Sequence, residues 1–351
     1  MLGGIHVRIV SPLALALASL LLASSDLSAQ PPAAPARPPC ATNDANFACT
    51  GTQTGPEDLE VLANGQWVIA SAMSGSGGLA AIRASDRSVV KIYPSATSKQ
   101  ARDDKLYKDC PGPPNPQKFT THGLWLFSGG GPVERLLAVG HGEREAIEMF
   151  NINIQGDVPQ ATWVGCVIAP EPIGLNSVRG FQDGGFITTN FLPRGASADE
   201  RTRMSNGGKN GELWEWHPHG KWQKVPGSEA AGANGVELSK DGKTIYMAAW
   251  GSQSFVRLSR GEKKVSRDEV PLGFRIDNIH WANDEKTLLA VGQGEGRWIA
   301  VKIDPLTLQV TEALNREDTP AFGAGTVAAE VGKTWWIGSY VGDRIAIVPA
   351  P

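Results

Sequence analysis

The sequence repeats a pair of short β-rich runs, set among Gly/Asn/Asp turns, and the pair occurs six times. The first runs of the pairs are QWVIAS, RLLAVG, GFITTN, KTIYMAAW, TLLAVG and KTWWIGS. Their partners are LAAIR, IEMFNI, ELWEWH, SFVRLSR, WIAVKI and RIAIVP. This pattern, without long helical periodicity, is typical of an all-β fold. Six units of about 50 residues suit four-stranded blades, which must stack to bury both faces. We therefore predict an all-β six-bladed β-propeller with four-stranded blades around a central channel; a pair of large β-sandwiches is the alternative.

The N-terminal residues differ in composition from the rest of the chain. Residues 1–29 contain His6 and Arg8, the apolar run IVSPLALALASLLLA and a small-residue LSA site, which together predict an export signal peptide. The apolar run is shorter than the roughly 20 residues of a spanning helix, although an uncleaved anchor is the alternative. Residues 30–39 form a Pro/Ala linker, and residues 40–351 are predicted to be the propeller. We expect a periplasmic or secreted protein with no stable membrane span.

The cysteines agree with an oxidising compartment. Cys40, Cys49, Cys110 and Cys166 could form up to two disulfides. Three pairings are possible, and the sequence does not choose among them. Our working hypothesis is Cys49 with Cys110, a bond that would fix the loop DCPGPPNPQKF beside the first blade. No C-x-x-C pair is present, so we expect neither a zinc site nor a redox site.

A polar position recurs ahead of successive units, seven or eight residues before the turn. Its occurrences are Glu57-Asp58, His122, Asn176, Asn234 and Asp277-Asn278. In a radial fold, a group repeated at one offset in each unit forms a ring around the axis. Asn and Asp also cap turns, which is the alternative explanation for any one of these residues. The recurrence over several units favours a ring.

The ring residues have the chemistry of a calcium site. Calcium takes six to eight oxygen ligands from carboxylates, amides, carbonyls and water. Oxygen donors of these kinds come from four units and are Glu57, Asn176, Asn234, Asp277 and Asn278. Zinc would instead recruit histidine or cysteine. We therefore predict one catalytic calcium ion at this ring.

Two histidines are candidates for a catalytic base. His122 occupies the ring position of its unit, and His141 ends the strand that returns from the next turn. Antiparallel pairing could bring the two imidazoles together, and such a pair can act as a base near neutral pH. A structural role is the alternative for both residues. We assign His217, His219 and His280 ordinary strand or surface roles. The chain has no G-x-S-x-G motif, and its glycine-rich runs lack the lysine of a phosphate-binding loop.

Several segments together resemble the paraoxonase/arylesterase family, within the gluconolactonase-like six-bladed propellers. They are GPEDLEVL, THGLWL, AVGHGEREAIEMF, GLNSV, GANGVELSKDGKTIYMA and RIDNIHW, spread over about residues 55–300. The resemblance implies lactone hydrolysis, often with aryl-ester hydrolysis. It also implies a calcium held by the ring residues and a base dyad of His122 and His141. A second, structural calcium would correspond to Asp58 and the Leu124 carbonyl. There the chain departs from the family, because Ser177 stands where the family has an aspartate. The family's terminal disulfide is also missing.

The predicted function is calcium-dependent hydrolysis of a small-molecule lactone, and also of aryl esters, by a metal-polarised carbonyl and a histidine-activated water. The alternatives are a sugar-lactone gluconolactonase, another propeller enzyme such as an isomerase without the histidine dyad, and a non-catalytic periplasmic binding propeller. The net charge of −3, without a basic run, argues against nucleic acid as a partner. Segments 94–118 and 192–211 are candidate lids. The predicted pocket walls are Phe119, Trp125, Phe191 and Trp250.

Overall fold

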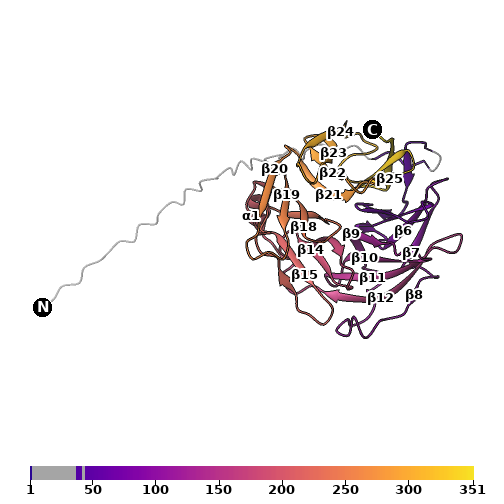
Figure 1. The fold of residues 1–351 in the computed structure, drawn as a ribbon, viewed down its shortest axis with the longest axis horizontal. Coiled ribbons are helices and arrows are strands. Elements are labelled where there is room, and N and C mark those ends of the chain that lie inside the picture. Colours follow the sequence, from indigo (N-terminus) through magenta and orange to yellow (C-terminus); the bar gives the residue numbers. More distant parts are fainter. Residues whose placement is uncertain (2–36, 42–43) are drawn as a thin grey trace. The chain divides into compact units, whose positions relative to one another are not determined.

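The computed structural model describes residue 1, residues 37–41 and residues 44–351. The predicted signal peptide (1–29) lies outside the described residues apart from residue 1, and the predicted linker (30–39) does so up to residue 36. Six sheets of four or five strands are arranged in a ring (Figure 1), and a seventh sheet has two strands. This arrangement confirms the predicted six-bladed β-propeller with four-stranded blades.

In the first five blades the four blade strands follow chain order from the channel outward. The first blade consists of β3 (Leu59–Val61), β4 (Trp67–Ala70), β6 (Leu79–Arg83) and β7 (Val89–Tyr93). The second consists of β9 (Thr120–Phe127), β10 (Val133–His141), β11 (Ala146–Asn153) and β12 (Gln160–Ile168), with β8 (Lys99–Gln100) at its outer edge. The third consists of β13 (Leu175–Gly180), β14 (Phe186–Asn190), β15 (Glu212–Trp216) and β16 (Gln223–Lys224).

The fourth and fifth blades have the same order. The fourth consists of β17 (Ala233–Leu238), β18 (Thr244–Ala249), β19 (Ser254–Ser259) and β20 (Arg267–Pro271). The fifth consists of β21 (Arg275–Trp281), β22 (Leu288–Gly294), β23 (Arg297–Ile303) and β24 (Val310–Glu317). The sixth consists of β25 (Gly325–Val331), β26 (Thr334–Ser339), β27 (Arg344–Pro349) and β1 (Phe47–Cys49). A separate two-stranded antiparallel sheet pairs β2 (Gln53–Thr54) with β5 (Ser74–Gly75).

The six predicted hairpins are the middle pairs of the six blades. They are β4–β6, β10–β11, β14–β15, β18–β19, β22–β23 and β26–β27, all antiparallel. The ring is closed by the two ends of the folded chain. The N-terminal β1 pairs with the C-terminal β27, placing Phe47 opposite Ala346 and Cys49 opposite Arg344. The sixth blade is therefore built from both ends of the chain.

The disulfides differ from the working hypothesis. The bonds join Cys40 to Cys49 and Cys110 to Cys166, so the Cys49–Cys110 pairing is wrong. Cys49 belongs to the closing strand β1 in the sixth blade, away from the loop that carries Cys110. The loop with Cys110 comes directly after β8, which pairs with β12 at the outer edge of the second blade. Segment 94–118, a predicted lid, is thereby fastened to the outer edge of a blade.

Large apolar side chains fill the spaces between blades. Trp67, Trp163, Trp335 and Trp336 are each at most 2% exposed, and they come from the first, second and sixth blades. Fully burying a large side chain stabilises the fold by roughly 1.5–3 kcal/mol. The stacking that the hairpin pattern required is therefore provided by aromatic residues on the inter-blade faces.

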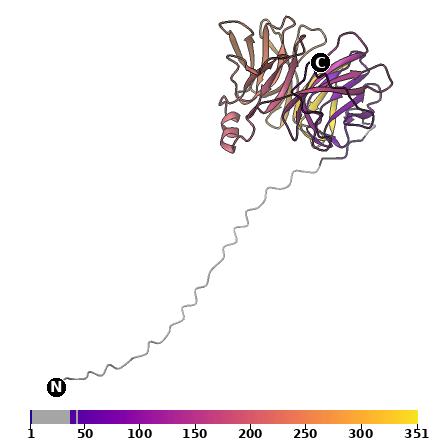
Figure 2. The ribbon, with the colours of Figure 1, turned by 90° about the horizontal axis from the view of Figure 1, so that it is seen from below.

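Segment 192–211 contains a helix that the sequence analysis did not predict. The helix α1 (Ala198–Ser205) lies between β14 and β15, beyond the strand ends (Figure 2). It begins with a capping box, in which Ser197 and Glu200 bond to each other's backbone N–H groups. Its one buried side chain is Met204, so it lacks the apolar stripe by which helices are recognised. In the part of the chain that the structure describes, no helix has the length and apolar character of a membrane span.

Candidate functional site

The predicted polar positions lie on the innermost strands, where these strands surround the channel. Each innermost strand contacts the next around the ring. A β-bulge interrupts the register of β9, β13, β17, β21 and β25. The bulged residues include His122, Asn176, Asn234, Asp277-Asn278 and Thr326. Bulges redirect side chains next to active sites, and here they coincide with the predicted ring. Glu57 and Asp58 directly precede β3.

Two glycines allow the innermost strands to approach closely. A Cβ added to Gly123, directly after His122, would lie 2.5 Å from the Asn176 carbonyl oxygen. A Cβ added to Gly235 would lie 2.6 Å from the Asp277 carbonyl oxygen. Only a residue without a side chain fits at such distances. The T-H-G and A-N-G motifs therefore place neighbouring ring residues within reach of one another.

The five predicted calcium ligands are brought together and buried. Glu57, Asn176, Asn234, Asp277 and Asn278 are each between 0 and 5% exposed. The Asn278 side-chain amide donates to Glu57, and the backbone of Gly235, next to Asn234, closely approaches that of Asp277. Gln293 Nε2 donates to Asp277 Oδ2 at 2.7 Å. The site thus connects the first, fourth and fifth blades directly.

Three oxygens of this group have no hydrogen-bond partner among the described residues. They are Glu57 Oε2, Asn176 Oδ1 and Asn234 Oδ1. Buried polar atoms without partners are rare and need an explanation, of which an ion is one. Among residues 37–41 and 44–351, no cluster of three or more His, Cys, Asp or Glu side chains could hold a metal by itself. The asparagine amides are therefore essential to the oxygen set, which fits a hard cation such as calcium.

The carboxylates of the ring also favour a bound cation. Burial and the nearby Asp277 and Asp58 carboxylates raise the pKa of Glu57 well above its usual value. Burial raises the pKa of Asp277 to about 7. Both shifts express the cost of placing negative charge in a low-dielectric site. A divalent cation held between Glu57 and Asp277 would offset that cost.

The two predicted histidines form a hydrogen-bonded pair. His122 Nδ1 lies 3.1 Å from His141 Nε2. His141 Nδ1 lies 2.8 Å from Glu145 Oε1. A carboxylate only accepts, so we assign the proton of His141 to Nδ1, which leaves its Nε2 to accept from His122 Nδ1. His122 Nε2 is then the unprotonated nitrogen, which accepts from Asn176 Nδ2 at 3.3 Å and lies 3.7 Å from Glu57 Oε2. This acceptor lies beside the proposed ion ligands.

The environment keeps the first imidazole neutral. Burial, followed by the neighbouring His141, lowers the pKa of His122 well below its usual value. A neutral imidazole is the form that can accept a proton. Glu145 lies behind the dyad and also accepts from Leu175 N through Oε2 at 3.1 Å. The carboxylate thereby connects the dyad to the innermost strand of the third blade.

The position implied for a second calcium has its own partners. Asp58 Oδ1 lies 2.9 Å from His280 Nε2, and its Oδ2 accepts from Leu124 N at 2.7 Å. Asp58 and other nearby carboxylates raise the pKa of His280 to about 9 against the opposing effect of burial. Ser177 Oγ accepts from Val236 N at 3.3 Å. Here a protonated histidine supplies the positive charge, so these residues do not fit a second ion. The ordinary role predicted for His280 omitted this contact.

A hollow of about 380 Å³ opens at the dyad. Its wall includes Met73, His122, His141, Asn176, Phe191, Arg194 and Arg201. Of the predicted wall residues, Phe191 lines this hollow. Trp250 packs edge-on against the Phe191 ring, with the ring centroids 5.8 Å apart. Phe119 instead belongs to the buried core, and Trp125 packs under Arg179. We call this hollow the mouth pocket.

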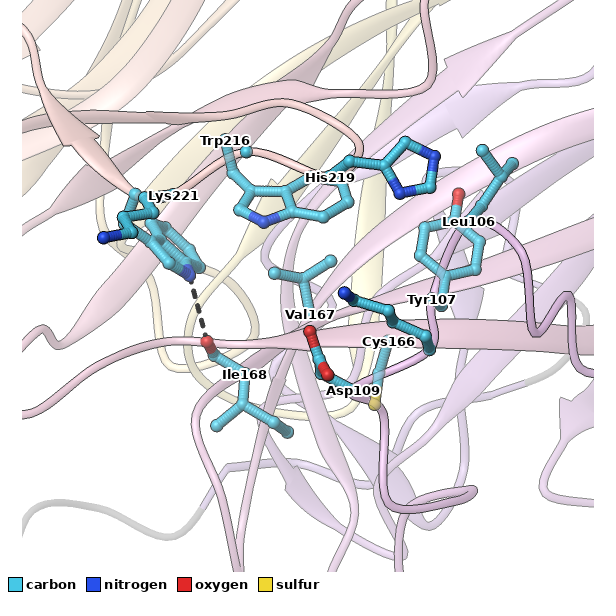
Figure 3. A pocket seen from close by; sticks show the side chains of 12 residues that line it. Leu106, Tyr107, Asp109, Cys166, Val167, Ile168, Trp216, His219 and Lys221 are labelled. Carbon is cyan, nitrogen blue, oxygen red and sulfur yellow. Dashed lines mark hydrogen bonds between the residues drawn. The ribbon is translucent and has the colours of Figure 1, made fainter.

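A separate hollow of about 450 Å³ lies between the outer parts of the second and third blades (Figure 3). Tyr107 and Trp216 form its apolar wall, and His219 and Lys221 lie at its edge. Neither the ring residues nor the histidine dyad line it. The histidine dyad and Asn176, by contrast, line the mouth pocket.

Sequence reasoning missed several residues of the site. Glu145 follows His141 by four residues in the run HGERE, and this short spacing is the one sequence feature that indicates a contact between them. Gln293 holds Asp277 from the neighbouring strand. Thr326 adds the sixth blade to the ring, donating to the Glu57 carbonyl oxygen at 2.6 Å. Nothing in their sequence context distinguishes Gln293 or Thr326.

Comparisons with known proteins agree with the architecture. No family model matches the chain, and no curated protein matches it. A luciferin-regenerating enzyme is similar in structure, with 14% identity over 86% of this chain and 92% of its own, at a TM-score of 0.53. A putative gluconolactonase has 14% identity over 86% and 91%, at 0.54. A gluconolactonase from Xanthomonas campestris has 15% identity over 87% and 88%, also at 0.54. At these identities the likeness establishes the shared propeller fold.

Proposed function

We propose that the protein is a calcium-dependent lactone hydrolase, with the mouth pocket as its active site. The observation that carries the proposal is the position of His122 Nε2, an unprotonated acceptor beside buried oxygens that lack partners. A base next to a cation site is the arrangement that metal-assisted hydrolysis requires. Of the similar structures named above, one is a gluconolactonase and another a putative gluconolactonase, which supports a lactone as the substrate class.

The ion would be held by Glu57, Asn176, Asn234, Asp277 and Asn278. Bound there, calcium would act as a Lewis acid toward the substrate carbonyl. We propose a single ion, because both oxygens of Asp58 already have protein partners. We therefore propose no second, structural ion at Asp58 and the Leu124 carbonyl.

The chain's own residues would move the proton. His122 Nε2 accepts a proton from water, and the resulting hydroxide adds to the carbonyl carbon of the lactone. The ring C–O bond then breaks, and the departing alkoxide oxygen takes the proton back from Nε2. The net reaction converts lactone and water into a hydroxy acid. His141 orients His122 through Nδ1, and the Glu145 carboxylate offsets the positive charge that develops on the dyad.

The cellular setting follows from the cysteines. Two disulfides, Cys40–Cys49 and Cys110–Cys166, fit an oxidising compartment. We therefore propose a periplasmic or secreted enzyme acting on a small molecule, without nucleic acid as a partner.

A substrate panel tests this function. The purified protein is assayed with γ-butyrolactone, glucono-δ-lactone and phenyl acetate at neutral pH. Hydrolysis of γ-butyrolactone at a rate well above background is expected, with phenyl acetate as a weaker substrate. Activity confined to glucono-δ-lactone would favour a sugar-lactone gluconolactonase. Absence of hydrolysis with all three would favour a binding propeller and contradict the proposal.

A further inference from the structure

Two arginines line the mouth pocket together with the histidine dyad. Arg194 lies in the segment after β14, and Arg201 lies on α1. The same wall contains one glutamate, Glu145, whose carboxylate already accepts from His141 and Leu175. The cationic side chains therefore exceed the free anionic ones in this pocket.

Neither guanidinium is fully satisfied within the protein. Among residues 37–41 and 44–351, Arg201 makes a backbone hydrogen bond to Ser197 but has no ion pair and no side-chain hydrogen bond. Arg194 pairs through Nη1 with Glu171 at 2.7 Å, but the Glu171 side chain is 74% exposed. Exposed pairs of this kind contribute little. Arg194 Nε is buried and has no partner in the described part of the chain.

The helix that carries Arg201 is held in place. Ser197 caps it, and Met204 is buried at the opposite end. The Met204 sulfur lies so close to Gly232 that a Cβ there would be 2.8 Å away. The Asn210 side-chain amide also donates to the Glu200 carbonyl oxygen at 3.2 Å. Arg201 is therefore presented on a packed element rather than on a free loop.

We infer that the mouth pocket selects lactones that carry a carboxylate, which Arg201 and Arg194 bind while the lactone carbonyl faces the dyad. This inference rests on the proposed function and specifies its substrate class. A guanidinium binds a carboxylate through two parallel N–H···O bonds, which fixes orientation as well as charge. A neutral substrate would desolvate the same groups without giving them an acceptor, which disfavours its binding.

The test uses two substrates that differ in one charge. γ-Butyrolactone γ-carboxylate and its primary amide have nearly the same shape, and their kcat/KM values are compared for the wild-type protein. We expect the carboxylate to be preferred by about tenfold or more, as for one charged hydrogen bond. Raising the salt concentration should reduce the preference, because exposed charges are screened within about 8–10 Å.

Variants assign the preference to the arginines. Arg201→Met should reduce the carboxylate-to-amide ratio by about tenfold, mainly through KM, and Arg201→Lys should restore part of it. Arg203→Met is the matched control, since Arg203 is on the same helix but does not line the pocket. An equal kcat/KM for the two lactones, or an unchanged ratio in Arg201→Met, would overturn the inference while leaving lactone hydrolysis standing.

Binding separates this inference from the proposed function. The ring-opened product of the carboxylate, a hydroxy diacid, is titrated calorimetrically against its monoamide. Tighter binding of the diacid, reduced in Arg201→Met but not in Arg203→Met, would retain the carboxylate site even if neither lactone is opened. In that case the hydrolase proposal alone would fail. Binding of the diacid that is unchanged in Arg201→Met would overturn the carboxylate site.

Discussion

The carboxylate behind the dyad offers a sharp test of the proton-transfer scheme. Replacing Glu145 by Gln retains the size of the side chain but removes its charge. The carboxylate now accepts from His141 Nδ1 at 2.8 Å and from Leu175 N at 3.1 Å. The single carbonyl oxygen of glutamine cannot serve both donors equally. Glu145 does not touch the reacting atoms, so it acts as a positioning residue.

The magnitude follows from the geometry of the pair. Two unit charges about 4 Å apart attract by about 4 kcal/mol at an effective dielectric of 20. The side chains of Glu145 and His141 are 14% and 24% exposed, so water reduces this value. Hydrogen bonds to charged groups contribute about 1.5–3 kcal/mol. A loss of about 2 kcal/mol in the transition state lowers kcat roughly 30-fold.

The pH profile distinguishes this role from a structural one. Burial and His141 hold the pKa of His122 below its usual value, and removing the Glu145 charge would lower it further. The acidic limb of the kcat/KM profile, which reports the free base, should therefore move to lower pH as the plateau falls. Glu143→Gln is the control, because Glu143 bonds Lys118 and Asn115 on the surface. An unchanged rate and profile in Glu145→Gln would refute the assigned relay.

Two further substitutions test the base and the packing beneath it. His122→Gln should lower lactone turnover at least 100-fold, as loss of a general base does, while calorimetric calcium binding persists; unchanged turnover would exclude His122 as the base. Arg144→Met should destabilise the fold by about 3 kcal/mol at pH 8, measured by urea unfolding, because it leaves the buried Glu148 carboxylate without its 2.7 Å partner. Burial already raises the pKa of Glu148, and the substitution raises it further. The loss of stability should shrink toward pH 4, where the Glu148 carboxyl group is largely protonated in the folded and in the unfolded protein. A loss of stability that is independent of pH would contradict this explanation.

The architecture could be predicted because it depends on local patterns. Most of the hairpins are short β-rich runs separated by Gly/Asn/Asp turns, so the signals lie close together in the chain. The ring could be predicted for the same reason, since one offset repeated in each unit maps onto one level of the channel. The helix α1 escaped because it is polar and buries only Met204.

Other parts of the site depend on contacts between distant segments. The bulges that turn Asn176 and Asn234 toward the channel are properties of strand register, which the sequence does not state. The pairing of Cys110 with Cys166 required knowing which blade edge the loop follows. The contact of His280 with Asp58 joins residues of the fifth and first blades that are more than 200 positions apart in the chain. No local pattern contains that information.

The most direct test of the central claim measures calcium binding and lactone hydrolysis on one preparation. The protein is stripped with a chelator, titrated with Ca²⁺ by calorimetry, and assayed with γ-butyrolactone at each point. The account predicts one site per chain, activity that returns in proportion to its occupancy, and stabilisation by about 2.7 kcal/mol at 100 times Kd. Full hydrolysis by the stripped protein, or no binding of calcium, would contradict it.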